Sequence, residues 1–207
     1  LKVLFGMVVC GYIIGSKQGF MYIRGEYPES INITNVALAK LRELGLLGEN
    51  ILGSGFDFDM NVVEGQGAYI CGEETALIAS IEGRRAEVDV RPPFPVVEGL
   101  YKKPTVVNNV ESLAAVAAIL KHGSKSYKSI GNGRSLGPKL ISLDGFFNNP
   151  GLYEVDLGTS LEFIIDEIGG GFNTDIKAIQ IGGPLGGIVP VDKLKSLTLD
   201  FEVFAEA

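Results

Sequence analysis

The chain has 207 residues, of which 46% are hydrophobic and 21% are charged, and its formal net charge is −7 at pH 7. This length and composition are typical of a globular protein with one or two domains, and they exclude a disordered chain. The acidic balance gives no support to a nucleic-acid partner or to an anionic membrane surface, because both attract basic proteins.

The first predicted elements alternate between helix and strand. Residues 2–16 predict a buried helix, residues 20–23 a short buried strand, and residues 30–47 a helix with apolar residues at helical spacing. Residues 56–65 alternate apolar and acidic side chains, which indicates a half-exposed strand, and residues 73–82 predict a helix. This order is typical of a layered α/β domain.

The apolar opening and the cysteines bear on the cellular compartment. The opening spans about 15 residues, which is too short to cross a bilayer, and it lacks the basic segment of a signal peptide. Cys10 and Cys71 stand in no metal-ligand spacing, so we expect neither a disulfide framework nor an iron–sulfur cluster held by this chain. The chain reads as intracellular, and its first residue is not Met, so we expect it to be part of a longer polypeptide.

A long irregular segment follows. Residues 84–107 contain four prolines that exclude a regular helix, and a loop of this length in a compact domain is usually functional. The next helix begins at Asn108 and Asn109, and Asn108 with Glu111 resembles a capping box. Both asparagines also stand where a helix N-terminus can seat a phosphate, so capping and ligand binding both remain open. His122, the only histidine, ends this helix and suits a capping role, so histidine-based catalysis has no support.

The remainder of the chain differs from the first part in its residue pattern. Residues 124–137 are polar and rich in glycine, which predicts a linker. A strand–turn–strand pattern, a capped helix and further strands follow, and together they predict a small α+β domain of the β-grasp, ubiquitin-like type. The strands are predicted at 138–145, 152–158, 177–183 and 186–190, and the helix at 159–171. We therefore expect two domains, residues 1–133 and residues 134–207.

Two adjacent carboxylates, Glu73 and Glu74, stand at the start of the helix predicted at 73–82. Acidic residues in a first helical turn complement the helix dipole, by about 0.3–1 kcal/mol each, which is a purely structural interpretation. One such residue would suffice for that purpose, and neighbours on a helix point about 100° apart, so both cannot serve the same point. The residues alone leave a structural role and a ligand site equally open.

Four motifs occur in order along the chain: YIRGEYP at 22–28, GAYICGEETAL at 67–77, RPPFP at 91–95 and PTVVNNVESLA at 104–114. Together they resemble the NADH-binding flavoprotein subunit of NADH:quinone oxidoreductase, respiratory complex I, and the related subunits of NAD-linked hydrogenases and formate dehydrogenases. The chain from Gly137 onward resembles the soluble-ligand-binding β-grasp domain that follows the flavin domain. The resemblance implies the C-terminal part of a layered, Rossmann-like flavin domain followed by this module.

The resemblance also implies a function and a site. In this family FMN takes hydride from NADH, and single electrons then pass to iron–sulfur clusters. Glu74 would be the carboxylate nearest the nicotinamide and hence the catalytic residue, Phe94 would line the adenine pocket, and Cys71 would lie beside the flavin as a thiol. No metal ligand is implied in this chain. The implied cofactor-binding residues are Tyr69, Gly72, Glu73, Glu74, Phe94, Val107, Asn108 and Asn109.

The chain departs from the family pattern at both ends. The upstream glycine-rich loop with its lysine, the acidic segment after it, and the downstream cysteine cluster of the four-iron centre are absent. We therefore expect the isolated chain to be inactive. The implied partners are other subunits of a multi-subunit oxidoreductase, including an iron–sulfur subunit, without direct membrane insertion. The implied location is the cytoplasm, or its side of the inner membrane through those subunits. The alternative is a stand-alone β-grasp ligand- or partner-binding module with a vestigial flavin half.

Overall fold

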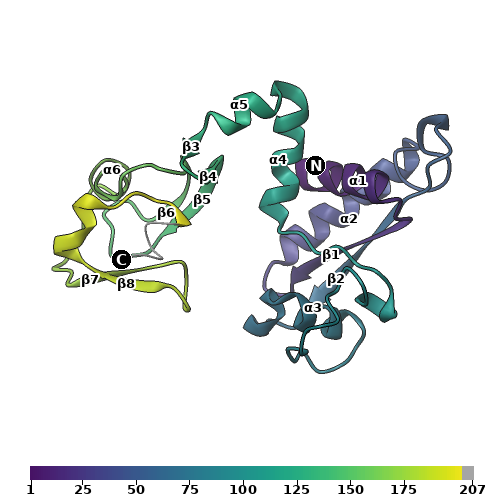
Figure 1. Ribbon diagram of the computed structural model, residues 1–207, viewed down its shortest axis with the longest axis horizontal. Coiled ribbons are helices and arrows are strands. Elements are labelled where there is room, and N and C mark those ends of the chain that lie inside the picture. The colour runs from purple at the N-terminus through teal and green to yellow at the C-terminus, as the bar shows by residue number, and fades with distance from the viewer. Residues whose placement is uncertain (202–207) are drawn as a thin grey trace. The chain divides into compact units, whose positions relative to one another are not determined.

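The protein is a mixed α/β protein, as expected at the level of fold class. The structure is a computed structural model that describes residues 1–201 (Figure 1). It divides into two compact units, the N-terminal unit Leu1–Ala117 and the C-terminal unit that begins at Ala118. No helix in the part of the chain that the structure describes is long and apolar enough to span a bilayer.

The predicted alternation of helix and strand in the N-terminal unit is confirmed. It consists of α1 (Lys2–Ile14), β1 (Gln18–Arg24), α2 (Pro28–Glu43), β2 (Asp59–Gly65) and α3 (Glu74–Ile81). Helix α2 begins earlier than predicted because a proline in the first turn has no hydrogen bond to lose there. Strands β1 and β2 lie side by side and pair in parallel, and α2 is the crossover that a parallel pair requires (Figure 1).

The core of the N-terminal unit lies between the parallel strands and the helices. Its buried members are Leu4, Met21, Leu38, Leu47, Ile51, Phe58 and Met60. Helix α1 was expected to be buried, but its last residues, Tyr12, Ile13 and Ile14, are exposed. The helix does make a close approach through Gly6, since a Cβ atom there would lie 2.1 Å from the carbonyl oxygen of Leu113. A glycine therefore allows α1 and α4 (Val110–His122) to touch.

The segment between α3 and α4 is irregular, as its prolines predict, apart from a short 3₁₀ turn at Leu100–Lys102. Backbone amides attach it to α3 at two places. The Asp89 amide donates to the hydroxyl of Thr75 at 2.9 Å, and the Tyr101 amide donates to the carboxylate of Glu82 at 2.7 Å. The loop is therefore held against both ends of this helix.

The C-terminal unit contains the predicted strands and helix. Strand β5 (Pro138–Leu143) pairs antiparallel with β6 (Gly151–Asp156), and β7 (Ala178–Ile181) pairs antiparallel with β8 (Gly187–Pro190). The helical segment consists of α6 (Leu161–Phe163) and a π-helical turn that continues it. The core around them is formed by Leu143, Phe147, Val155, Leu161, Ile164, Ile165, Val189 and Leu194.

The segment 124–137 was predicted to be a linker, and this is wrong. It forms α5 (Ser124–Lys128) and a small hairpin of β3 (Gly131–Asn132) and β4 (Ser135–Leu136). The glycines serve turns and close packing. Gly137 has a φ of 93°, and a Cβ atom there would lie 2.2 Å from the hydroxyl of Tyr127. Glycine content in this segment therefore reflects close packing and conformations that other residues rarely adopt.

Candidate functional site

Glu73 caps helix α3. Strand β2 leads through a 3₁₀ turn, Tyr69–Gly72, to Glu73, whose backbone is extended rather than helical. The carboxylate oxygen Oε2 accepts hydrogen bonds from the amides of Thr75 at 2.8 Å and Ala76 at 3.0 Å, and from the Thr75 hydroxyl at 2.5 Å. These contacts satisfy amides of the first turn that have no partner inside the helix. Glu73 therefore has a structural role as the N-cap of α3, and only Glu74 lies in the first turn, where the helix-dipole interpretation applies.

The same contacts fix the ionisation of Glu73. Burial opposes the charged form, but the hydrogen bonds from the Thr75 hydroxyl and from the amides of Ala76 and Thr75, with the charge of Arg91, outweigh it and lower the pKa of Glu73. The other oxygen, Oε1, is buried and has no hydrogen-bond partner within residues 1–201. Its charged neighbour is the guanidinium group of Arg91, whose Nη2 lies 3.6 Å away.

Arg91, which lies in the irregular loop, contacts both carboxylates. Its Nη1 lies 2.7 Å from Oε1 of Glu74, and its Nη2 lies 3.6 Å from Oε1 of Glu73. The expectation that the two carboxylates could not serve one point is wrong, because Glu73 lies outside the helix and only Glu74 follows helical geometry. Sequence reasoning missed Arg91, and the only signal for it was its place in the RPPFP motif.

Replacing the cap should measurably destabilise the protein. We expect Glu73→Ala to lower the free energy of unfolding by about 1–2 kcal/mol at neutral pH, since an N-cap is lost. The pKa of Glu73 lies below its ordinary value of 4.5, so its contribution is complete above that pH and is lost as the pH falls through the lowered pKa. Urea denaturation at pH 7 and in mild acid should show the difference from wild type shrinking in acid. Glu43→Gln, at an exposed ion pair, is the control, and an equal loss in both variants would contradict the assignment.

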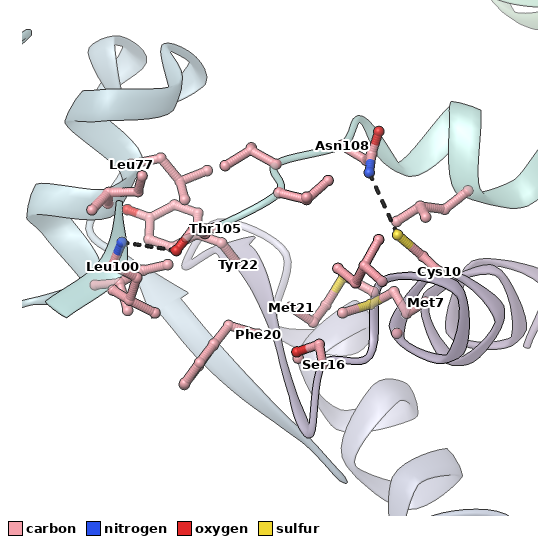
Figure 2. A pocket seen from close by; sticks show the side chains of 18 of the residues that line it. Met7, Cys10, Ser16, Phe20, Met21, Tyr22, Leu77, Leu100, Thr105 and Asn108 are labelled. Atoms are coloured by element: carbon pink, nitrogen blue, oxygen red, sulfur yellow. Dashed lines mark hydrogen bonds between the residues drawn. The ribbon is translucent and has the colours of Figure 1, made fainter. Parts of the chain in front are cut away.

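The N-terminal unit also contains an apolar cavity of about 180 Å³ (Figure 2). Residues of α1, β1, α3 and the segment before α4 line it, and Val107 and Asn108 are among them. Figure 2 shows the Asn108 amide directed toward Cys10 on α1, with 3.9 Å between Nδ2 and Sγ. The thiol is a weak acceptor, so a stronger acceptor on a ligand can replace it.

Asn108 and Asn109 have different roles, and the residue that caps the helix is not the one that was predicted. Asn109, rather than Asn108, caps α4, and its Oδ1 accepts from the amide of Glu111 at 2.8 Å. The helix begins at Val110, so Asn109 is the residue at the N-cap position. The amide of Asn108 is therefore not used by the helix, and it lines the cavity instead.

The structure distributes the remaining predicted residues over three segments. Tyr69 and Gly72 lie in the turn before α3, next to Glu73 and Glu74. A Cβ atom on Gly72 would meet nothing within 4 Å, so open space lies beside this backbone. Phe94 lies in the irregular loop, where 53% of its surface is exposed. Residues of α3 and of the segment before α4 line the same cavity. Among the predicted site residues, only Val107 and Asn108 are part of this lining.

The described residues fit one part of a flavin mononucleotide. The cavity is smaller than the range of about 300–1,000 Å³ typical of sites for ligands of this size. Its lining within residues 1–201 is mostly apolar and includes no charged side chain, so a phosphate would find amide donors there but no ion-pair partner. The Asn108 amide and the N-terminus of α4 add hydrogen-bonding groups suited to the polar edge of such a ligand.

The cysteines form no metal centre or disulfide in the part of the chain that the structure describes. Cys10 and Cys71 are both free thiols, and Cys71 is buried. Within residues 1–201, no three or more His, Cys, Asp or Glu residues gather in a group that could hold a metal ion.

The fold and the candidate site are those of an α/β protein that binds a nucleotide cofactor. The acidic pair and the turn before it follow the carboxyl end of β2 in a parallel pair, which is where α/β proteins bind nucleotide cofactors. The chain belongs to the Nuo51 FMN-binding domain family, whose model matches residues 1–118.

Relatives are found over almost the whole chain. It is 47% identical over 206 residues to NADP-reducing hydrogenase subunit HndC of Solidesulfovibrio fructosivorans, covering 99% of this chain and 42% of that protein. It is 44% identical over 208 residues to an NADH-quinone oxidoreductase subunit of Rhizobium meliloti, covering 100% and 49%. The chain thus spans about half the length of the curated relatives it matches. None of these relatives favours the stand-alone β-grasp module.

A solved structure also resembles this one. The crystal structure of an NAD⁺-reducing [NiFe]-hydrogenase in the H₂-reduced state superposes with a TM-score of 0.86 and 34% sequence identity. The match covers 98% of this chain and 34% of that chain. The similarity therefore extends through both compact units.

Proposed function

We propose that the chain is part of an NADH-oxidising flavoprotein subunit that passes electrons to iron–sulfur clusters. One observation carries the proposal. The family match at residues 1–118 coincides with the N-terminal unit, Leu1–Ala117, which contains every predicted cofactor residue. The names of the relatives, which are subunits of NADH-quinone oxidoreductase and NADP-reducing hydrogenase, support the same conclusion.

In this proposal FMN, when bound, supplies the hydride and electron chemistry. The chain's own residues bind the cofactor and orient the nucleotide. Asn108, Asn109 and the N-terminus of α4 hold the phosphate side of the cofactor. Tyr69, Gly72 and Glu73 border the flavin. Glu74 accepts a hydrogen bond from the nicotinamide carboxamide, and Phe94 packs against the adenine.

The architecture and setting form part of the proposal. Residues 1–133 are the C-terminal part of a layered, Rossmann-like flavin domain, and residues 134–207 form a β-grasp domain. The hairpins and the helical segment of the C-terminal unit support the second assignment. The partners are further subunits, including an iron–sulfur subunit, and the location is the cytoplasm.

The β-grasp assignment predicts independent folding. We expect residues 134–207 to fold alone with a stability of a few kcal/mol, because their strand pairs are local in sequence. A polypeptide of residues 124–207 should be more stable, since β3 pairs with β4 and the Gly137 amide donates to the Ile130 carbonyl. Amide NMR spectra and urea denaturation of both polypeptides test this, and collapsed spectra from both would overturn the assignment.

Anaerobic flavin reduction tests the function directly. The whole flavin-loaded subunit is mixed with NADH, or with NADPH, and the oxidised flavin band is followed. Rapid bleaching by either nucleotide is expected, and the comparison identifies the nucleotide. A flavin that binds but stays oxidised with both nucleotides would refute NADH oxidation as the function.

A further inference from the structure

Two residues, Asp89 and Arg91, attach the loop to the start of α3. The Asp89 amide donates to the Thr75 hydroxyl at 2.9 Å, and this hydroxyl donates to Oε2 of Glu73. Two residues further on, Arg91 contacts Glu74 at 2.7 Å and Glu73 at 3.6 Å. The contacts form one network, in which the loop and the helix cap are linked through the acidic pair.

Arg91 is chemically suited to this position. A guanidinium group is planar, permanently charged and has five N–H donors, so it can face two carboxylates at once. Its side chain is 38% exposed, against 34% for Glu74 and 26% for Glu73. All three groups are therefore partly withdrawn from water, where the pairing is screened less than at a fully exposed surface.

The electrical balance of the acidic pair depends on Arg91. Glu73 and Glu74 together bring two negative charges to the start of α3, and among residues 1–201 Arg91 supplies the positive charge that forms ion pairs with them. Without it, the two carboxylates would repel each other and project a stronger negative field toward any bound group. Glu73 is already held by its capping hydrogen bonds, so Arg91 bears mainly on the orientation of Glu74 and on how negative the site is.

We propose that Arg91 is a positioning residue that acts through Glu73 and Glu74. It holds the loop against α3, fixes the orientation of the Glu74 carboxylate and offsets the negative charge of the pair. Its effect on the flavin rests on the proposed function, whereas its hold on the loop does not. The two parts can therefore be tested separately.

The first experiment uses the 207-residue chain without cofactor. Hydrogen exchange at the amides of Asp89, Thr75 and Ala76 is compared between wild type and Arg91→Gln. We expect severalfold faster exchange in the variant. Arg85→Gln is the matched control, because Arg85 lies in the same loop and its ion pair is with the nearby, exposed Glu87 rather than with α3. Exchange at the wild-type rate in Arg91→Gln, or equal acceleration in both variants, would overturn the proposal.

The second experiment measures the flavin midpoint potential in the whole, flavin-loaded subunit. Arg91→Gln should lower the potential, because it uncovers negative charge that disfavours reduced flavin. Each tenfold change in the redox equilibrium corresponds to about 30 mV for two electrons. Arg91→Lys should restore most of the potential. An unchanged potential in Arg91→Gln would refute charge compensation, whereas failure to react with NADH in wild type would refute only the proposed function.

Discussion

Glu74→Ala in the whole, flavin-loaded subunit should reduce NADH turnover by about a hundredfold. A loss of this size is expected when a reacting group is misplaced by about 1 Å. In the proposed function the Glu74 carboxylate accepts a hydrogen bond from the nicotinamide carboxamide, which fixes the geometry of hydride transfer. Alanine removes the acceptor and also frees Arg91, whose Nη1 lies 2.7 Å from Glu74.

Glu74→Gln separates the two effects of the carboxylate, because it keeps the shape and removes the charge. If electrostatics dominates, the flavin potential should rise by tens of millivolts, since about 30 mV corresponds to about 1.4 kcal/mol for two electrons. If positioning dominates, the potential should hardly move and the affinity for NADH should change instead. Potentiometry and steady-state kinetics on both variants distinguish these outcomes.

Glu29→Gln is the matched control for Glu74, because Glu29 is also an acidic residue in the first turn of a helix, α2. It should behave as wild type in every measurement. Wild-type turnover, affinity and potential in both Glu74 variants would show that Glu74 only complements the helix dipole.

The 207-residue chain should bind FMN only in the millimolar range. Its cavity of about 180 Å³ is small for this ligand, and its described lining includes no charged side chain to pair with a phosphate. Several absent charge-assisted hydrogen bonds, at about 1.5–3 kcal/mol each, weaken binding by orders of magnitude, since 1.4 kcal/mol is a factor of ten.

Titration calorimetry with FMN measures this affinity, and Asn108→Ala shows whether the residual binding uses the cavity. Asn109→Ala is a useful comparison, since Asn109 caps α4 through its contact with Glu111 and should lower stability as well. Submicromolar binding by the wild-type chain would show that the described residues suffice for a complete site.

The order of elements was readable from sequence because local patterns determine it. The apolar spacing of α2, the prolines between α3 and α4, and the strands of the C-terminal unit each act within a few residues. The errors arose where contacts outside the regular spacing of helices and strands decide the conformation. The segment 124–137 looked like a linker, but Gly137 packs against Tyr127 and its amide bonds to Ile130. Composition alone does not distinguish a flexible glycine from a closely packed one.

For the candidate site, too, local patterns were predicted from the sequence and longer-range contacts were not. Sequence placed Glu73 and the asparagine pair at helix starts, which the structure confirms, but the cap of α4 is Asn109 because the helix begins one residue later than expected. Arg91 was missed because its partner Glu74 lies 17 residues away, and no local periodicity connects a loop arginine to a helix cap. Long-range ion pairs of this kind require the fold.

The parallel pairing of β1 with β2 has a consequence for the kinetics of folding. Gln18 pairs with Asp59, so about forty residues must close into a loop before the first strand contact forms. In the C-terminal unit, Leu143 pairs with Gly151 across a short turn. The N-terminal unit is synthesised first, but we expect it to fold more slowly than the C-terminal unit. Its unpaired strands should therefore remain exposed for longer during synthesis on the ribosome.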